Sequence, residues 1–174
     1  MRKAIFLDRD GTLNKAFIKN GLPFSPESFN EFEILPGVKE SLLKLKKLNF
    51  VCLLITNQPD VSRGKINKNV VIQMNNFLKS EIKLDDIFVC YHDDHDNCEC
   101  RKPKPGLLLN AKKKWNINLN KSYMIGDRWK DIQAGINAGC KTVFINNNYK
   151  ESKKIKANFI ADSLLNAVYI LEKL

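Results

Sequence analysis

The sequence has no apolar run approaching the roughly 20 residues that a transmembrane helix needs. Its longest apolar run, residues 50–55, has the length of a buried strand. The N-terminal segment MRKAIFLDRDGTLN returns to charged residues after a short apolar stretch, and it lacks the small-residue cleavage site of a signal peptide. We therefore expect a cytoplasmic protein that has no membrane partner.

Arginine is also scarce, because only five of the 29 Lys and Arg residues are Arg. The formal net charge is +10, yet no arginine stripe with interleaved aromatics is present, which argues against a nucleic-acid partner. Four of the arginines, Arg9, Arg63, Arg101 and Arg128, fall in the polar segments described below, where a planar guanidinium suits phosphate recognition. The positive charge is compatible with an anionic substrate but does not select one.

The cysteine count of five is odd, which argues against a disulfide framework. Cys90, Cys98 and Cys100 lie within eleven residues of one another, and His92 and His95 stand among them. Three thiolates and one imidazole form a tetrahedral zinc set, and four protein ligands are typical of a structural site. A group of free thiols is the alternative, although such a group would be liable to oxidation.

The chain has 174 residues, which is the size of one domain, and expected strands alternate with expected helices. The strands are 4–7, 51–55, 87–89, 123–125 and 142–145, and the helices are 37–48, 68–82, 106–115, 131–138 and 163–174. This alternation predicts an α/β domain over residues 1–174, with a parallel sheet that has helices on both faces. Residues 14–36 form a longer loop or flap, and residues 93–104 form an irregular insert.

Polar side chains follow the first four expected strands. Ligands of such sheets bind beyond the carboxyl ends of the strands, so these side chains are candidates for one site. They are Asp8, Arg9, Asp10, Thr56, Asn57, Gln58, Arg101, Lys102, Asp127, Arg128 and Asp131.

The residue types in this set suit phosphoryl chemistry. One of Asp8 and Asp10 can attack as a nucleophile while the other transfers a proton. Asp127 can join Asp8 around Mg²⁺, which prefers oxygen ligands. Thr56 and Lys102 supply a hydroxyl donor and a cation that can offset phosphoryl charge. Taken singly, each feature is also compatible with a turn, a helix cap or a surface lysine.

In chain order, the segments after these strands read DRDGT, TNQ, RKPKPG and GDRxxDIxAG. Together they resemble the haloacid dehalogenase (HAD) superfamily of phosphotransferases, and the resemblance extends from residue 4 to about residue 145. It implies that Asp8 is the nucleophile that forms an aspartyl-phosphate and that Asp10 is the general acid/base. It also implies that Thr56 and Lys102 bind the phosphoryl group.

The same resemblance implies a Mg²⁺ site. Its ligands are the side chains of Asp8 and Asp127 and the backbone carbonyl of Asp10. Asp131 and Arg128 then support the site from the fourth motif.

The cysteine-rich loop, residues 90–100, runs directly into RKPKPGL, and this arrangement resembles the heptose-1,7-bisphosphate 7-phosphatases of that superfamily. The resemblance favours His92 over His95 as the zinc ligand beside Cys90, Cys98 and Cys100. It also makes Arg63, Arg101 and the loop carrying Asn57 and Gln58 candidate substrate contacts. The sequence departs from the commoner pattern where Pro59-Asp60 replaces Ser-Gly.

We therefore expect a monomeric, single-domain phosphatase with no large cap, which uses Mg²⁺ and carries a structural zinc. Its substrate is a small sugar bisphosphate, with the 7-phosphate of D-glycero-D-manno-heptose 1,7-bisphosphate as the expected target. Histidinol phosphate is the alternative substrate. A phospho-accepting switch module would not need Asp10, and a zinc-stabilised nucleic-acid binder would not place so many acidic residues beside its metal loop.

Overall fold

The chain folds into a parallel sheet of six strands in the order β5-β4-β1-β6-β7-β8, in a computed structural model that describes residues 1–150 and 156–174. The strands are Lys3–Leu7 (β1), Phe50–Asn57 (β4), Asp86–Cys90 (β5), Tyr123–Gly126 (β6), Lys141–Ile145 (β7) and Phe159–Ala161 (β8). Strand β1 pairs with β4 on one side and with β6 on the other, so the strand order reverses there. Such a switch point positions a ligand site in open α/β sheets.

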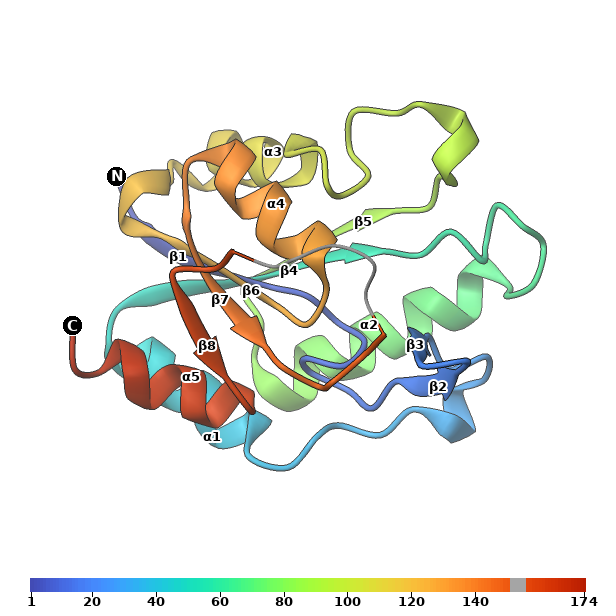
Figure 1. Cartoon of the computed structure of the whole chain (residues 1–174), viewed down its shortest axis with the longest axis horizontal. Coiled ribbons are helices and arrows are strands. Elements are labelled where there is room, and N and C mark those ends of the chain that lie inside the picture. Colours follow the sequence, from blue (N-terminus) through green and yellow to red (C-terminus); the bar gives the residue numbers. More distant parts are fainter. Residues whose placement is uncertain (151–155) are drawn as a thin grey trace.

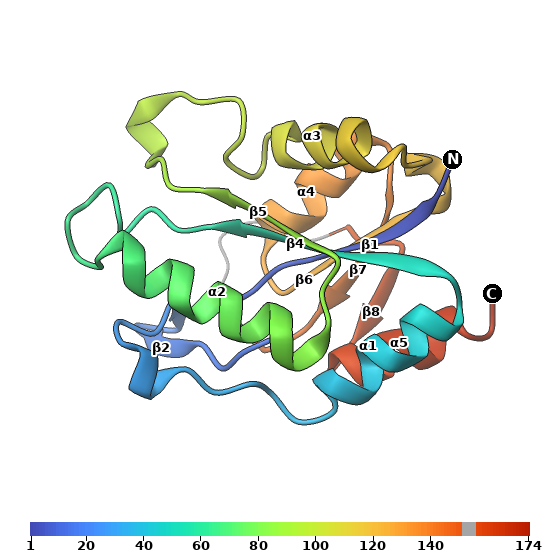
Figure 2. The same cartoon turned by 180° about the vertical axis from the view of Figure 1, so that it is seen from behind.

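Helices cover both faces of the sheet (Figures 1 and 2). Helices Val38–Lys47 (α1), Lys68–Ile82 (α2) and Leu164–Leu171 (α5) pack on one face, and Gly106–Trp115 (α3) and Trp129–Ala138 (α4) pack on the other. The side chains of β1 alternate between the two cores: Ile5 and Leu7 face the first group of helices, and Ala4 and Phe6 face the second. This double-sided burial fixes the strand ends that carry the polar residues.

The flap, residues 14–36, contains a short antiparallel hairpin of Phe17–Lys19 (β2) and Leu22–Phe24 (β3), followed by the 3₁₀ turn Phe29–Glu31 (η1). Asn20 and Gly21 link the two strands with φ values of 54° and 80°. Two consecutive left-handed residues form the tight turn that suits the twist of a hairpin, and Asn-Gly is its preferred sequence. The predicted absence of a large cap is confirmed for the described residues, because this hairpin is the main addition on that side.

The cysteine-rich loop leaves the end of β5 and lies at the same end of the sheet as the flap hairpin but apart from it (Figure 1). It contains one 3₁₀ turn, Asp94–Asp96 (η2), and returns to the core at α3. A second such turn, Leu119–Lys121 (η3), precedes β6. The flap and the cysteine-rich loop thus stand on either side of the carboxyl edge of the sheet.

The predicted α/β class and the alternation of strands and helices are confirmed, with differences at several ends. Strand β5 extends one residue beyond 87–89 at each end, α4 begins at Trp129 instead of Asp131, and α5 ends at Leu171 instead of Leu174. The sequence analysis missed β8 and the flap hairpin, because strands of three residues are too short to show a periodicity. Among the described residues, no helix combines the length and apolar character required to cross a membrane.

Candidate active site

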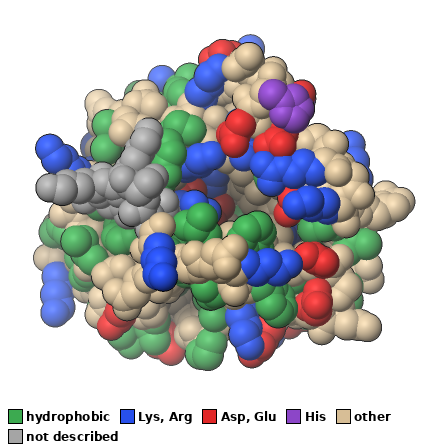
Figure 3. Space-filling model, turned by 45° about the vertical axis from the view of Figure 1, so that its right-hand side comes forward, with side chains coloured by type: hydrophobic (Ala, Val, Ile, Leu, Met, Phe, Trp, Pro, Cys, Tyr) green, Lys and Arg blue, Asp and Glu red, His purple; other side chains and the backbone are tan. Residues whose placement is uncertain are grey.

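A pocket of about 400 Å³ opens at the carboxyl edge of the sheet, between the flap and the cysteine-rich loop. Figure 3 shows the hollow, with Lys and Arg side chains close to Asp and Glu side chains around it. Most of the predicted site residues line this pocket, namely Asp8, Asp10, Asn57, Arg63, Arg101, Lys102, Arg128 and Asp131. Thr56, Gln58 and Asp127 are at most 1% exposed and are not among the lining residues.

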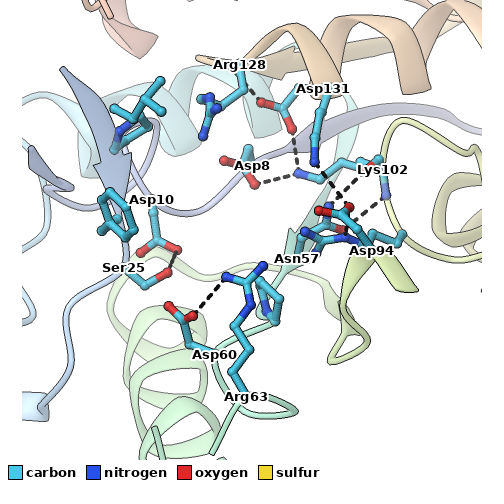
Figure 4. A pocket seen from close by; sticks show the side chains of 16 residues that line it. Asp8, Asp10, Ser25, Asn57, Asp60, Arg63, Asp94, Lys102, Arg128 and Asp131 are labelled. Carbon is cyan, nitrogen blue, oxygen red and sulfur yellow. Dashed lines mark hydrogen bonds and ion pairs between the residues drawn. The ribbon is translucent and has the colours of Figure 1, made fainter. Parts of the chain in front are cut away.

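Lys102 lies between two carboxylates at the bottom of the pocket (Figure 4). Its Nζ is 2.6 Å from Asp8 Oδ1 and 2.6 Å from Asp131 Oδ1, and it donates to the backbone carbonyl of Ile55 at 2.8 Å. The side chain is only 2% exposed. Burial lowers the pKa of Lys102, but the charges of Asp131 and Asp8 outweigh burial and raise the pKa overall, so Lys102 is a fixed cation.

Asp8 follows β1 directly and is 8% exposed. Burial raises its pKa to about 6, and the nearby charge of Asp131 adds to the rise while Lys102 opposes it. A carboxylate with little water around it, held against an ammonium, suits attack on an electrophilic centre that enters the pocket.

Asp127, at the end of β6, is fully buried beside Asp8 and Asp131. One carboxylate oxygen from each of the three lies within 4.8 Å of the others, and among the described residues Asp127 Oδ1 has no hydrogen-bond partner. Burial, then the charges of Asp8 and Asp131, raise the pKa of Asp127 well above its usual value. Three clustered carboxylates with an unpartnered buried oxygen fit a hard divalent cation such as Mg²⁺.

Gly11 allows the backbone after β1 to lie close to the Asp127 carboxylate. Its φ is +87°, a left-handed value, and an added Cβ would lie 1.9 Å from Asp127 Oδ2. Any side chain at this position would therefore displace the Asp127 carboxylate.

The Asp10 carboxylate points away from Asp8 and toward Ser25 of the flap (Figure 4). It accepts hydrogen bonds from Ser25 Oγ at 2.9 Å, Gln58 Nε2 at 2.8 Å and Asn14 Nδ2 at 3.0 Å, and it pairs with Arg9 at 3.1 Å. Burial raises its pKa, but the charge of Arg9 and these hydrogen bonds prevail and hold the pKa below its usual value. The pKa values of the two predicted catalytic aspartates are therefore shifted in opposite directions, with that of Asp8 raised and that of Asp10 lowered.

The residues at the end of β4 hold the site together. Thr56 Oγ1 accepts a hydrogen bond from Gln58 Nε2 at 2.9 Å. The side-chain amide of Asn57 binds both the backbone N–H and the carbonyl of Lys102 at 3.1 Å. Asn57 thus fixes the backbone from which the Lys102 ammonium reaches into the pocket.

Basic side chains on the pocket wall are held by carboxylates of the cysteine-rich loop. Arg63 makes two bonds to Asp93, at 2.6 and 2.5 Å, and Arg101 Nε donates to Asp94 at 2.8 Å. The hydrogen bonds from Arg63 lower the pKa of Asp93, so both partners of that pair stay charged. The Arg128 backbone N–H donates to Asp131 Oδ2 at 3.0 Å. The guanidinium groups of Arg63 and Arg101 are thereby held in place along the pocket wall.

The cysteine-rich loop gathers the predicted zinc ligands. Cys90 and Cys98 Sγ are 3.7 Å apart, and Cys100 Sγ is 3.2 Å from Cys90 and 3.3 Å from His92 Nδ1. A tetrahedral ion with Zn–S bonds of about 2.3 Å separates its sulfurs by roughly 3.7 Å, so the donor set fits zinc. His95 is outside the cluster and its side chain is 80% exposed, in agreement with the choice of His92.

The sequence analysis missed several residues that contact the catalytic groups. Ser25 and Asn14 belong to the flap, where no pattern predicted their position. Asn147 follows β7, and its Nδ2 donates to the Gly11 carbonyl at 2.9 Å. The rule that directed attention to the ends of the first four strands would have found Asn147 if applied to the fifth.

The fold and site define a phosphatase of the HAD class. A family model described as HAD-hydrolase-like matches residues 99–167. The chain is 35% identical to the D-glycero-beta-D-manno-heptose-1,7-bisphosphate 7-phosphatase of Pasteurella multocida over 94% of each chain. It is 41% identical to the protein of that name from Helicobacter pylori over 80% of each chain.

The chain belongs to the family of these heptose-bisphosphate phosphatases. A crystal structure of the D,D-heptose 1.7-bisphosphate phosphatase from B. bronchiseptica, complexed with magnesium and phosphate, is also similar. It has a TM-score of 0.84 and 25% identity, and 98% of each chain is covered. The predicted family and enzyme class are confirmed.

Proposed function

We propose that this protein removes the 7-phosphate of D-glycero-D-manno-heptose 1,7-bisphosphate through an aspartyl-phosphate intermediate. The observation that carries the proposal is the charge pattern of one pocket. Buried Asp8, held by Lys102, lies at its bottom, and Arg63 and Arg101 line its wall. A substrate with two phosphates has one group for each region. The names of the relatives supply the particular sugar.

In the first half-reaction, Asp8 attacks phosphorus and the bond from phosphorus to the sugar oxygen breaks. Asp10 gives a proton to that leaving oxygen. Lys102 and the Thr56 hydroxyl offset the charge on the phosphoryl oxygens. A bound Mg²⁺, held by Asp8, Asp127 and the Asp10 carbonyl, would supply further charge neutralisation.

In the second half-reaction, Asp10 accepts a proton from water as the water attacks the phosphorus of the aspartyl-phosphate. Phosphate leaves, and Asp8 is restored as a carboxylate. The hydrogen bonds from Ser25 and Gln58 keep Asp10 oriented through both proton transfers. Asn57, Gln58, Arg128 and Asp131 act as supports of these groups, and the cysteine-rich loop orients Arg101 and Arg63.

A phosphate-release screen tests the substrate. The panel contains heptose and hexose bisphosphates, histidinol phosphate and nucleotides, each with Mg²⁺. We expect the heptose 1,7-bisphosphate to have the highest kcat/KM, because discrimination resides in that ratio. The Asp8→Asn variant gives the background rate. A higher kcat/KM for histidinol phosphate or for a nucleotide would contradict the assignment.

The remaining predictions concern the molecule in solution. We propose that residues 1–174 act as one phosphatase domain, as a monomer, in the cytoplasm and without a nucleic-acid or membrane partner. Sedimentation at micromolar concentration checks the monomer, and a weak, non-cooperative response to added DNA at low salt is expected.

A further inference from the structure

We propose that Asn147 and Tyr149, in the segment after β7, are positioning residues that hold the Asp127 carboxylate in the orientation that receives the divalent cation. This inference rests on the proposed Mg²⁺-dependent function. It concerns a segment outside the four motifs that identify the family, and it follows from a chain of hydrogen bonds behind the acidic site.

The chain of hydrogen bonds begins at Asn147. Its Nδ2 donates to the Gly11 carbonyl at 2.9 Å and to Tyr149 Oη at 3.0 Å, and it lies 3.5 Å from Asp127 Oδ2. Tyr149 Oη faces the Asp127 carboxylate across the space beside Gly11, and its interaction with that carboxylate opposes the rise in the pKa of Asp127. Because the hydroxyl accepts from the amide, its own proton is directed to Asp127.

The two oxygens of Asp127 therefore have different surroundings. A Cβ built on Gly11 would lie 1.9 Å from Asp127 Oδ2 and 2.6 Å from Tyr149 Oη, so these two atoms converge on the same small space. Asp127 Oδ1 is buried and, within the described residues, has no partner. With Oδ2 bound from behind, rotation of the carboxylate is restrained and Oδ1 is presented to the space shared with Asp8 and Asp131.

The segment that carries these two side chains is anchored on the flap as well. The Lys150 backbone N–H donates to the Gly21 carbonyl at 2.9 Å, at the tip of the β2–β3 hairpin. A Cβ at Gly21 would lie 2.7 Å from the Lys150 side chain, so the hairpin turn and the segment after β7 are in direct contact. Tyr149 thus lies between Asp127 of the acidic site and the β2–β3 hairpin of the flap. Partners of a ligating carboxylate typically change metal affinity by 10- to 100-fold when they are removed.

The test is a Mn²⁺ titration of the zinc-loaded protein, followed by electron paramagnetic resonance, with Mg²⁺ added as a competitor. Mn²⁺ shares the preference of Mg²⁺ for carboxylate ligands. We expect Tyr149→Phe to weaken Mn²⁺ binding roughly 10-fold or more. The same variant should need correspondingly more Mg²⁺ for half-maximal phosphate release, with kcat recovered at saturation. Tyr169→Phe is the matched control, because Tyr169 is 41% exposed on α5, and it should behave as wild type.

Equal Mn²⁺ affinity for Tyr149→Phe and wild type would overturn the positioning role while leaving the phosphatase intact. Absence of Mn²⁺ binding by the wild type would overturn the cation site itself, and the positioning role with it. Should Tyr149→Phe fail to fold, as judged by zinc content and melting temperature, Asn147→Ser removes the amide donor and provides the same comparison.

Discussion

The side chains at the bottom of the pocket carry unequal numbers of opposite charges. Asp8 and Asp131 contact the ammonium of Lys102, Asp127 lies beside these two carboxylates, and Arg9 already neutralises Asp10. Burial, and then the repulsion between these carboxylates, raises the pKa values of Asp8 and Asp127. An anionic substrate would meet repulsion there until a divalent cation restores neutrality. The residues therefore favour a reaction in which the cation binds before the phosphate ester.

Asp127→Asn should separate stability from activity. A carboxylate whose folded pKa exceeds its unfolded value of about 3.8 makes folding less favourable as the pH rises between the two values. The ionised Asp127 carboxylate therefore opposes folding at neutral pH, and Asn removes that cost. We expect phosphate release to fall by about 10³-fold or more. The melting temperature in Mg²⁺-free buffer should rise by roughly 2–4 °C for each kcal/mol of relieved repulsion.

Calorimetry at pH 7 and at pH 4 checks this expectation. The gain in melting temperature should shrink at pH 4, where protonation of Asp8 and Asp127 relieves the repulsion in the wild type. A variant that melts below the wild type at pH 7 would show that Asp127 contributes attractive contacts that exceed the repulsion.

Asp8→Asn tests the nucleophile. The amide keeps the size of the side chain but removes the attacking charge, so we expect phosphate release to fall by about 10³-fold or more. Asp162→Asn, at an exposed position just after β8, is the control and should keep wild-type rates. Asp10→Asn retains a nucleophile and should accumulate aspartyl-phosphate with an activated ester. Near-normal turnover by Asp8→Asn would contradict the mechanism.

The cysteine-rich loop joins elements that are distant in the sequence. Asp93, next to the predicted zinc ligand His92, holds Arg63 from the loop after β4, and Arg101 directly follows Cys100. Exposed ion pairs usually contribute little, but here the acidic partner of each pair belongs to a loop that a metal can rigidify. We therefore expect an ordered cysteine-rich loop to fix the positions of the guanidinium groups of Arg63 and Arg101.

His92→Ala and His95→Ala form a matched pair that tests this connection. We expect wild type and His95→Ala to retain about one zinc per chain, because the part of the chain that the structure describes holds one Cys/His set of tetrahedral type. His92→Ala should lose the zinc and about 10-fold in kcat/KM on the bisphosphate. The loss on a small activated ester should be smaller, since that ester has no second phosphate. Elemental analysis and parallel kinetics measure both effects, and zinc retained by His92→Ala would refute the ligand set.

Some strands and helices could be predicted from the sequence more completely than others. Residues 51–55 and 123–125 are apolar runs buried on both faces, and their ends position Thr56 and Asp127 because parallel strands share one edge. The position of Asp131 near Asp127 could be predicted as well, because residues four apart at the start of a helix lie on the same face. Strand β8 and the flap hairpin have too few residues for a periodicity. The contacts of Ser25 and Tyr149 depend on how separate loops dock, which local sequence does not encode.

The whole molecule has an open pocket with no large cap over it within the described residues. The flap and the cysteine-rich loop are therefore the main surfaces available to select a substrate, together with the loop after β4. The net charge of +10 should speed the arrival of small anions, and this steering weakens as salt rises. Selectivity then depends on loops that are fixed at their ends by the sheet.

The position of β1 at the centre of the sheet also has a consequence for biosynthesis. Ala4 donates to Ser122, 118 residues further along, and β1 pairs with β6 at the same distance. At ~5–20 residues per second, a ribosome needs on the order of ten seconds to produce that partner. Until then the nascent chain has one edge of its central strand unpaired, which is a template for aggregation. Asp8 emerges first and meets Asp127 only when most of the chain has been made, so stalled chains should be both inactive and dependent on chaperones.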